Sequence, residues 1–255
     1  MSKDIDLTGL SVTIAIPVRN ARDITVPTAM SLVATVNELT RYGVQHETTV
    51  TQGDIVTHAR SYLAHRFLQG DKNRMFFIDS DLGWKAQDFI KLLAYSTAYD
   101  VIGAGYRAKR DPPFYLVHLG DDIRADERGC LECKDLSYGL GFTCIQRRVI
   151  EHMHAKAPVR KHTLHKQPFP DVFRFDRIGD EGELRGEDFT FLADCREAGF
   201  TTKIDPSIEI GHLGDKLFIG QVKDIIVPAT PAVSGYGEDI GTPMAGALNP
   251  IRKAG

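Results

Sequence analysis

Two aspartates directly follow the most hydrophobic segment of the chain. Residues 75–78 (MFFI) form a short apolar run that predicts a buried strand, and Asp79-Ser80-Asp81 comes immediately after it. Two carboxylates placed in this way suit Mg²⁺ or Mn²⁺, which prefer oxygen ligands and keep open positions for phosphate oxygens. Such an ion would stabilise the charge on a departing nucleoside diphosphate. The competing interpretation is a helix N-cap, where aspartate is common.

Three further residues could take part in the same chemistry. Glu187 and Asp188 open a predicted helix, where a carboxylate could act as general base toward an acceptor hydroxyl. Acidic residues also favour a first helical turn because they interact with the helix dipole. His212 lies in the segment Gly211-His212-Leu213-Gly214, and neutral imidazole is a good ligand for metals of the Mn²⁺ class. A single loop histidine is more often an ordinary surface residue.

Two other groups of residues have simpler interpretations. Cys130 and Cys133 form a CxxC pair, but no second pair and no spaced histidines complete a zinc site, so we expect structural thiols. The stretch from Arg147 to Lys166 is rich in arginine, lysine and histidine. It could hold a diphosphate or a polyanionic acceptor, but a solvated helix face is the simpler explanation.

Alternating strands and helices must position the candidate residues. Four short segments predict strands: residues 12–17, 45–51, 75–78 and 100–104. Three periodic segments between them predict helices: residues 26–41, 57–69 and 85–99. This alternation predicts an α/β fold, a three-layer α/β/α sandwich with a mainly parallel central sheet. Ligands bind beyond the carboxyl ends of such strands, which is where Pro17 and Asp79 lie.

The second half of the chain is less regular. Further segments predict strands: residues 115–119, 129–134, 142–146 and 203–210. Two periodic segments predict helices: residues 147–156 and 186–199. Residues 228–255 are rich in glycine and proline, and we expect a surface tail or a lid over the donor. We therefore predict one domain at 1–227, with a nucleotide-binding half at 12–104 and an acceptor half at 105–214.

The overall composition is that of an ordinary globular protein. Of the 255 residues, 42% are hydrophobic and 25% are charged, a balance that permits a substantial core. The net charge of −3 provides no overall basic field for nucleic acid or anionic lipid. There is no signal-like N-terminal segment and no apolar run long enough for a membrane span, so we expect a cytoplasmic protein.

Six motifs, in this order along the chain, resemble those of the GT-A glycosyltransferases. They are VTIAIPVRN, GDIVTHARSYLAHRFL, FFIDSDLGW, YGLGFTCIQRRVIEHM, GEDFTFLADCREAGF and KIDPSIEIGHLG, and together they span residues 12–214. The chain looks closest to the family-two-like and Mnn9-like branch, of bacterial or phage type. This resemblance implies transfer of a hexosyl or pentosyl group from a nucleoside-diphosphate sugar to an acceptor hydroxyl, with Mn²⁺ or Mg²⁺ as cofactor.

The resemblance also implies a role for each candidate residue. The nucleotide sugar would contact residues of the first loop, the second helix, the DSD motif and a glycine turn: Pro17, Val18, Arg19, Arg60, Asp79, Ser80 and Gly141. The metal ligands would be Asp79, Asp81 and His212. Asp188, with Glu187 beside it, would be the catalytic base if the enzyme inverts the anomeric centre. The acidic residue that usually reads uracil is not evident, so the sequence leaves the nucleobase open.

Two other functions remain open at this stage. A sugar-1-phosphate nucleotidyltransferase would share the sheet and the metal, although Pro17-Val18-Arg19-Asn20 stands where its glycine-rich signature would be. A non-catalytic module that binds a sugar nucleotide or a glycan would have no need to keep the carboxylates and the histidine together. The acceptor could be a glycan, a protein, a small molecule or hydroxymethylated DNA.

Overall fold

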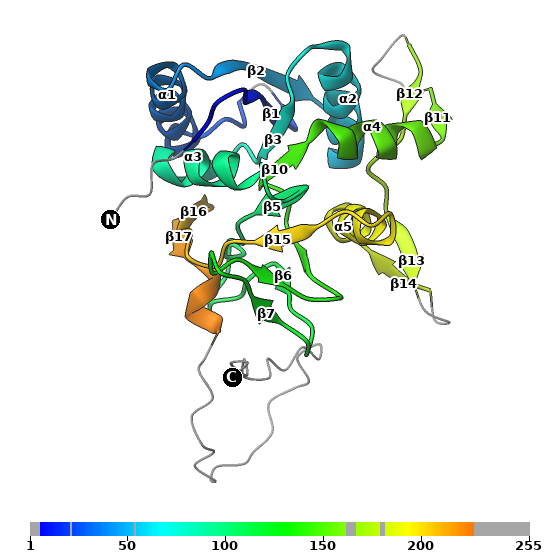
Figure 1. Cartoon of the computed structure of the whole chain (residues 1–255). Helices are drawn as coiled ribbons and strands as arrows, with labels where there is room; N and C mark the ends of the chain where they lie inside the picture. Colours follow the sequence, from blue (N-terminus) through cyan, green and yellow to red (C-terminus); the bar gives the residue numbers. More distant parts are fainter. Residues whose placement is uncertain (1–5, 21, 54, 162–166, 179–181, 227–255) are drawn as a thin grey trace.

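Eight strands form the central sheet of the molecule (Figure 1). The structure is a computed structural model that describes residues 6–20, 22–53, 55–161, 167–178 and 182–226. The predicted tail at 228–255, with its role as a lid, lies outside these residues. From one edge to the other, the strands are β2 (Gln45–Gln52), β1 (Ser11–Val18), β3 (Arg74–Ile78), β10 (Phe142–Gln146), β5 (Val101–Gly103), β15 (Thr202–Ile204), β8 (Leu131–Glu132) and β7 (Arg124–Ala125).

The sheet is mixed, but most of its strands run in one direction. β2, β1 and β3 are parallel to one another, and β15 is parallel to β5. β10 lies antiparallel between β3 and β5, so that β3 and β5 share one direction. β8 is antiparallel to both β15 and β7. The prediction of a mainly parallel sheet is confirmed, and the reversed strands are β10 and β8.

Helices cover both faces of the sheet (Figure 1). Two helices pack on one face: α1 (Val26–Arg41) and α3 (Ala86–Tyr95). Three helices pack on the other: α2 (Val56–Gln69), α4 (Arg147–Lys156) and α5 (Glu187–Glu197). The predicted three-layer α/β/α sandwich is therefore confirmed. None of the helices in the described part of the chain is long and apolar enough to cross a membrane.

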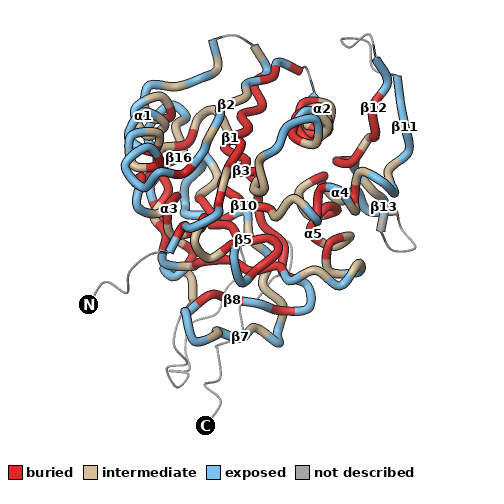
Figure 2. The backbone as a smooth tube through the Cα atoms, turned by 45° about the horizontal axis from the view of Figure 1, so that its top comes forward, coloured by how far each residue is buried: buried red, intermediate tan, exposed pale blue. Residues whose placement is uncertain are grey.

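Residues of β3 alternate between the two faces of the sheet. Phe76 and Ile78 belong to the core cluster under α1 and α3, whereas Met75 and Phe77 belong to the cluster under α2, α4 and α5. All four side chains are fully buried, and Figure 2 shows buried residues concentrated along the central strands. A strand that is covered on both faces needs apolar residues at every position, which explains the continuous MFFI run.

Four smaller sheets lie outside the central one in the described part of the chain. A three-stranded sheet joins strands that are far apart in the sequence: β4 (Leu82–Gly83), β16 (Ile210–Leu213) and β17 (Leu217–Gly220). Three two-stranded pairs complete the described strands: β6 (Val117–His118) with β9 (Ser137–Tyr138), β11 (Val159–Arg160) with β12 (Phe169–Pro170), and β13 (Asp176–Ile178) with β14 (Glu183–Arg185). A short 3₁₀ helix at Val222–Ile225 follows β17.

The helix predicted at 85–99 is shorter in the structure. It ends at Tyr95, and the next residue, Ser96, donates from its hydroxyl to the carbonyl oxygen of Leu93 at 2.6 Å. The same hydroxyl accepts a hydrogen bond from Arg74 Nε at 2.7 Å. Serine competes with the helical backbone for hydrogen bonds, and here that competition coincides with the end of the helix.

The strand predicted at 203–210 is two strands in two different sheets, β15 and β16. Between them Asp205 Oδ1 accepts hydrogen bonds from the backbone N–H and the hydroxyl of Ser207, which turns the chain. The strands predicted at 115–119 and 129–134 are also shorter, since β6 and β8 contain two residues each. The prediction was wrong about the extent of these elements.

Candidate functional site

One cleft collects nearly all the predicted site residues. It lies beyond the carboxyl ends of β1, β3 and β5, where open α/β sheets bind their ligands, and has a volume of about 770 Å³. Its lining includes every predicted site residue except Gly141: Pro17, Val18, Arg19, Arg60, Asp79, Ser80, Asp81, Glu187, Asp188 and His212.

The pairing of β4 with β16 brings Asp81 and His212 together. Asp81 directly precedes β4, and β16 pairs with β4 so that His212 lies opposite Leu82. The backbone N–H of Leu213 donates to the carbonyl oxygen of Asp81 at 2.8 Å. As a result, His212 Nε2 lies 3.4 Å from Asp81 Oδ1. The register of this small sheet therefore creates the contact between Asp81 and His212, two of the three predicted metal ligands.

The His212 ring has a defined orientation. Its Nδ1 lies 2.7 Å from the carbonyl oxygen of Arg107, and since a carbonyl only accepts, Nδ1 carries a proton. In the neutral ring, Nε2 then presents a lone pair toward the Asp81 carboxylate. A lone pair that faces a carboxylate oxygen is repelled unless a proton or a cation lies between them. The pair is therefore suited to hold a metal ion.

Asp81 is held in its ionised form. Burial by itself raises the pKa of Asp81, but a hydrogen bond from His212, made when Nε2 also carries a proton, and one from Lys109 outweigh it and hold the pKa below its usual value. Lys109 Nζ forms an ion pair with Asp81 Oδ2, the carboxylate oxygen that does not face His212. An ionised carboxylate is the form that a divalent cation binds.

Asp79 has different partners from Asp81. Its Oδ1 accepts a hydrogen bond from Arg60 Nη2 at 2.9 Å, and its Oδ2 accepts one from the Tyr106 hydroxyl at 2.8 Å. Its backbone N–H donates to the carbonyl oxygen of Gly141 at 2.9 Å. Both carboxylate oxygens are thus engaged, and direct coordination of a metal by Asp79 would compete with one of these hydrogen bonds.

Arg60 lies beneath the cleft as the shared partner of three carboxylates. Its side chain is 2% exposed, and Nη1 contacts Glu187 Oε1 at 2.9 Å and Asp188, while Nη2 contacts Asp79. The resemblance to GT-A enzymes implies that Arg60 contacts the nucleotide sugar, but in the structure its guanidinium is turned to these carboxylates, because acidic groups buried together require a counter-charge. Burial by itself lowers the pKa of Arg60, but the negative charges of Asp188, Asp79 and Glu187 outweigh this effect and raise the pKa well above its ordinary value.

Asp188 is the site carboxyl with the most altered protonation. Burial raises the pKa of Asp188 to about 7; Arg60 opposes this rise, whereas Glu187 and Asp79 add to it. Asp188 lies in the first turn of α5, and 23% of its side chain is exposed, in the lining of the cleft. A carboxyl that titrates near neutrality can accept a proton from a hydroxyl and release it again at neutral pH.

Gly141 lies behind Asp79 and does not line the cleft. A Cβ at this position would overlap Asp79 Oδ2 and the Tyr106 hydroxyl. Glycine is therefore required for the aspartate and the tyrosine to occupy the positions that they have. The contact between Gly141 and the donor sugar stays a prediction.

The end of β1 and the loop after it form another wall of the cleft. Pro17 and Val18 close the strand, and the Arg19 side chain is 78% exposed and lies 3.9 Å from Asp23. Asp23 Oδ2 also accepts a hydrogen bond from the backbone N–H of Asn20 at 2.8 Å. An acidic side chain that the sequence pattern does not single out is thus part of the wall predicted to contact the nucleotide.

Tyr106 and Lys109 line the cleft although the sequence motifs do not single them out. They follow β5 in the segment Gly105-Tyr106-Arg107-Ala108-Lys109. The carboxyl end of β5 lies at the same edge of the sheet as the ends of β1 and β3, because the three strands share one direction. The position of this segment after a predicted strand is the signal that could have identified both residues.

The side chains present fit a cation that is shared with a substrate. Within the described residues, no three histidine, cysteine, aspartate or glutamate side chains are grouped as a ready metal site. Asp81 and His212 offer one oxygen and one nitrogen ligand, while Asp79 is engaged elsewhere. A Mg²⁺ ion commonly uses only one or two protein ligands, with phosphate oxygens and water completing its coordination. A diphosphate would therefore have to supply part of the coordination shell.

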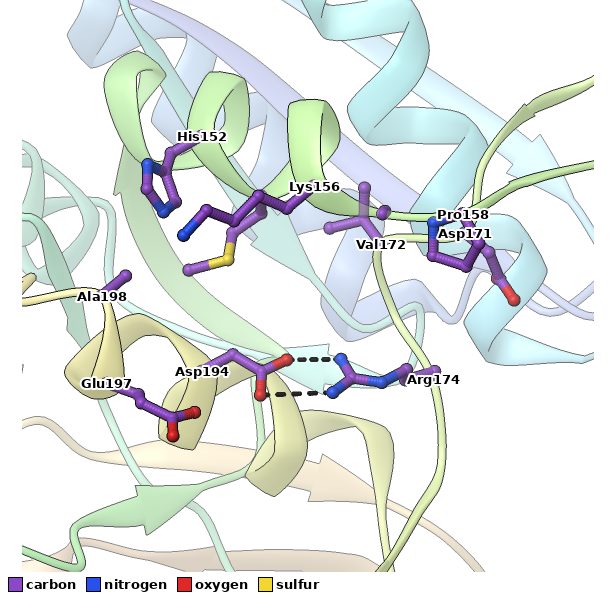
Figure 3. Close-up of a pocket in the computed structure, with 11 residues that line it drawn as sticks. His152, Lys156, Pro158, Asp171, Val172, Arg174, Asp194, Glu197 and Ala198 are labelled. Carbon is purple, nitrogen blue, oxygen red and sulfur yellow. Dashed lines mark hydrogen bonds and ion pairs between the residues drawn. The ribbon is translucent and has the colours of Figure 1, made fainter.

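A second cavity lies between α4 and α5 and has a volume of about 430 Å³ (Figure 3). Arg174 faces Asp194 in it and bonds to both carboxylate oxygens (Figure 3). Asp171 forms an ion pair with Arg160 at 3.2 Å, and Glu197 adds a further negative charge to the lining. Lys156 and Arg174 line the cavity together with three acidic residues, so it lacks the excess of positive charge that a diphosphate needs.

Several cations of the basic stretch at 147–166 have structural partners. Arg147 donates to three carbonyl oxygens at and after the end of α2, those of residues 68, 70 and 72, and pairs with Glu151. Arg148 forms an ion pair with the buried Asp100. These contacts favour a structural role over a polyanion site. Residues 162–166 lie outside the described part of the chain.

Cys130 and Cys133 flank β8, and both are buried. Burial raises the pKa of Cys130 to about 12 and also raises the pKa of Cys133. A thiol that stays protonated is a poor nucleophile and a poor metal ligand. These environments favour the interpretation of the CxxC pair as structural thiols.

Comparison with known proteins shows a shared fold. No protein-family model and no curated protein matches the chain. The structure of A197 from STIV is 19% identical, with 90% of this chain and 99% of that chain covered, at a TM-score of 0.51. GalNAc-T7, solved with UDP, GalNAc and Mn²⁺, is 10% identical over 80% of this chain and 44% of its own, at a TM-score of 0.46. A nucleoside-diphosphate-sugar pyrophosphorylase from Vibrio cholerae is 10% identical over 76% of this chain and 72% of its own, at a TM-score of 0.37. Among these three, A197 alone exceeds a TM-score of 0.5, and at this identity it shows the fold and not the activity.

Proposed function

We propose that this protein is a metal-dependent GT-A glycosyltransferase that moves a hexosyl or pentosyl group from a nucleoside-diphosphate sugar to an acceptor hydroxyl. The observation that carries the proposal is the presence, in one cleft, of the Asp81–His212 pair and of Asp188, whose pKa is about 7. A cation-binding pair and a carboxyl suited to proton transfer are two parts that this reaction needs. The six sequence motifs support the same assignment, including its Mnn9-like branch.

In this proposal the donor lies along the half of the domain at residues 12–104. Asp81 and His212 would hold Mn²⁺ or Mg²⁺, which when bound supplies charge stabilisation for the departing nucleoside diphosphate. The wall at residues 17–19 would contact the nucleotide. Asp79, held by Arg60 and Tyr106, would face the ribose or a water molecule with whichever oxygen it can release from these partners.

The acceptor would approach Asp188. Its carboxylate would take the proton of the acceptor hydroxyl while the hydroxyl oxygen bonds to the anomeric carbon and the sugar–phosphate bond breaks, which inverts the anomeric configuration. Arg60 positions Asp188 and Glu187 through its Nη1. A glycan, a protein or a small molecule would each present the hydroxyl that this step needs, as would hydroxymethylated DNA.

A panel of nucleotide sugars, scored for release of nucleoside diphosphate, tests the proposal. Release should require Mn²⁺ or Mg²⁺, stop with a chelator, and fall by about 100-fold or more in Asp81→Asn, since a metal ligand is lost. Asp71→Asn is the matched control, because Asp71 is 83% exposed and does not line the cleft; it should release at the wild-type rate. Metal-independent release, or full release by Asp81→Asn, would contradict the proposal.

The same panel separates the other two functions when it is extended to nucleoside triphosphates mixed with sugar 1-phosphates and scored for pyrophosphate. A nucleotidyltransferase would release pyrophosphate from a nucleoside triphosphate and a sugar 1-phosphate, and we expect none. A non-catalytic module would bind a nucleotide sugar without releasing nucleoside diphosphate from any donor, with or without an acceptor. Either outcome would replace the proposed transfer reaction.

A further inference from the structure

Lys109 is built into the candidate metal site rather than extended into solvent. Its Nζ pairs with Asp81 Oδ2, and its side chain is 37% exposed. Its aliphatic stem packs along Gly214, where an added Cβ would lie 3.2 Å from Lys109 Cδ and 3.3 Å from Lys109 Cβ. The carbonyl oxygen of Arg107, two residues earlier, accepts the hydrogen bond from His212 Nδ1. The short segment at residues 107–109 therefore contacts both Asp81 and His212.

The other described cations of the cleft are placed differently. Arg60 is buried and is shared by three carboxylates, so its charge is already compensated. Arg19 lies at the rim with 78% of its side chain exposed, and Arg22 is also exposed. Among the described cations that line the cleft, Lys109 is the one whose ammonium pairs with Asp81, the carboxylate that a divalent cation would bind.

We propose that Lys109 is an exchangeable counter-ion of Asp81: a divalent cation displaces its ammonium from the carboxylate, and the released ammonium binds the diphosphate of the donor. This inference rests on the proposed function. The exchange conserves charge pairing, because Asp81 gains the metal and Lys109 gains a phosphate oxygen. An ammonium on a flexible four-carbon stem, with three donors, is suited to change partners in this way.

The exchange has a thermodynamic consequence. A metal ion that arrives alone must separate Lys109 from Asp81 and leave its ammonium without an anionic partner. A metal ion that arrives with a diphosphate gives Lys109 a new partner at the same time. Binding of the two ligands should therefore be positively coupled, and Lys109 should carry part of this coupling.

Calorimetric titration of wild type and Lys109→Met tests the inference, with MnCl₂ alone and with inorganic pyrophosphate at saturating Mn²⁺ as probes. Methionine keeps an unbranched stem over Gly214 and removes the charge. We expect Mn²⁺ alone to bind the variant about 5-fold more tightly, because a competing ion pair is gone. Pyrophosphate should bind about 10-fold more weakly, because a charge-assisted hydrogen bond is lost.

Lys216→Met is the matched control. Lys216 follows Gly214 closely in the chain and pairs with Asp111, but it is 57% exposed and does not line the cleft. The Lys216→Met substitution removes the same charge at a nearby position, so it measures the long-range electrostatic part of each effect. We expect it to change the affinity for either probe by less than about 2-fold. Equal effects of Lys109→Met and Lys216→Met would overturn the exchange, as would a Lys109→Met protein that binds Mn²⁺ no more tightly than wild type.

The wild-type titrations separate failure of this inference from failure of the proposed function. If wild type binds neither Mn²⁺ nor pyrophosphate with Mn²⁺, the metal-dependent reaction is refuted and the exchange falls with it. If wild type binds both, and the two lysine variants behave alike, only the exchange is refuted. Thermal unfolding of each variant verifies that the chain is folded, and Lys109→Arg, which keeps the charge, should retain most of the pyrophosphate affinity.

Discussion

Replacing Arg60 by methionine would remove the guanidinium that Glu187, Asp188 and Asp79 share. The Arg60 side chain is 2% exposed, and the three carboxylates are 11%, 23% and 26% exposed. Methionine fills a similar volume, so the variant keeps most of the packing and loses the counter-charge. The acidic groups would then repel one another in a partly dehydrated site.

The expected loss of stability in Arg60→Met follows from the burial of the ion pairs. Removing one partner of a buried ion pair costs about 3–5 kcal/mol of stability. Because Asp188 and Asp79 are open to the cleft, water can hydrate them in part, and we expect the lower end, a loss of about 3 kcal/mol at pH 7. Because Arg60 lowers the pKa of Asp188, its loss raises that pKa further above 7, and the folded variant keeps a proton between pH 7 and 9 that the folded wild type releases. Stability of the variant therefore falls as pH rises, by up to about 1.4 kcal/mol per pH unit for each proton.

Urea unfolding of wild type and Arg60→Met at pH 7 and pH 9 measures both effects. The difference between the two proteins should grow at pH 9, where only the folded wild type has released the Asp188 proton. Arg41→Met is the surface control: Arg41 is 63% exposed and pairs with Glu38, so its loss should change stability by less than about 1 kcal/mol at either pH. A loss below 1 kcal/mol for Arg60→Met at pH 7, or an equal loss at both pH values, would refute a charge-based role.

Three further predictions follow from the site. Because a base must be deprotonated to act, kcat/KM should rise with pH through about 7 as Asp188 ionises; a flat profile between pH 5.5 and 8.5 would exclude it as the base. Gly141→Ala should lower stability by about 1–3 kcal/mol in thermal or urea unfolding, because the added Cβ would overlap Asp79. Gly186→Ala is the control: the added Cβ would lie in open space and φ is −62°, so stability should change by less than about 0.5 kcal/mol. Chelation of the metal should abolish nucleoside-diphosphate release in wild type, and Asp81→Asn should not regain it when Mn²⁺ is restored; recovery by this variant would exclude Asp81 as a ligand.

Local sequence patterns predict the helices and strands that carry the site, because burial makes hydrophobic residues recur with a spacing that depends on the type of element. A strand covered on both faces must be apolar throughout, and MFFI is such a strand. The same local signals predict that Asp79 follows the end of this strand and that Glu187 begins a helix. Extents were less well predicted where a single side chain interrupts the backbone pattern, as Ser96 does at the end of α3.

Partners across the cleft do not follow from local patterns. The resemblance to GT-A enzymes implies that His212 and Asp81 share a metal, but their 3.4 Å contact depends on the register between β16 and β4. No period in the sequence encodes the pairing of segments that are far apart in the chain. The same is true of Lys109, whose ammonium reaches Asp81 from the segment after another strand.

The sequence by itself determined that this protein is a three-layer α/β protein and that the Asp79–Asp81 segment lies at the carboxyl edge of its sheet. Hydrophobic period and strand ends are local properties, and the chain alone specifies them. Only the tertiary structure decided that Arg60 is turned to three carboxylates rather than free for a diphosphate, and that burial gives Asp188 a pKa near 7. Both results depend on which charges are enclosed together and how much water remains beside them, and these are consequences of packing.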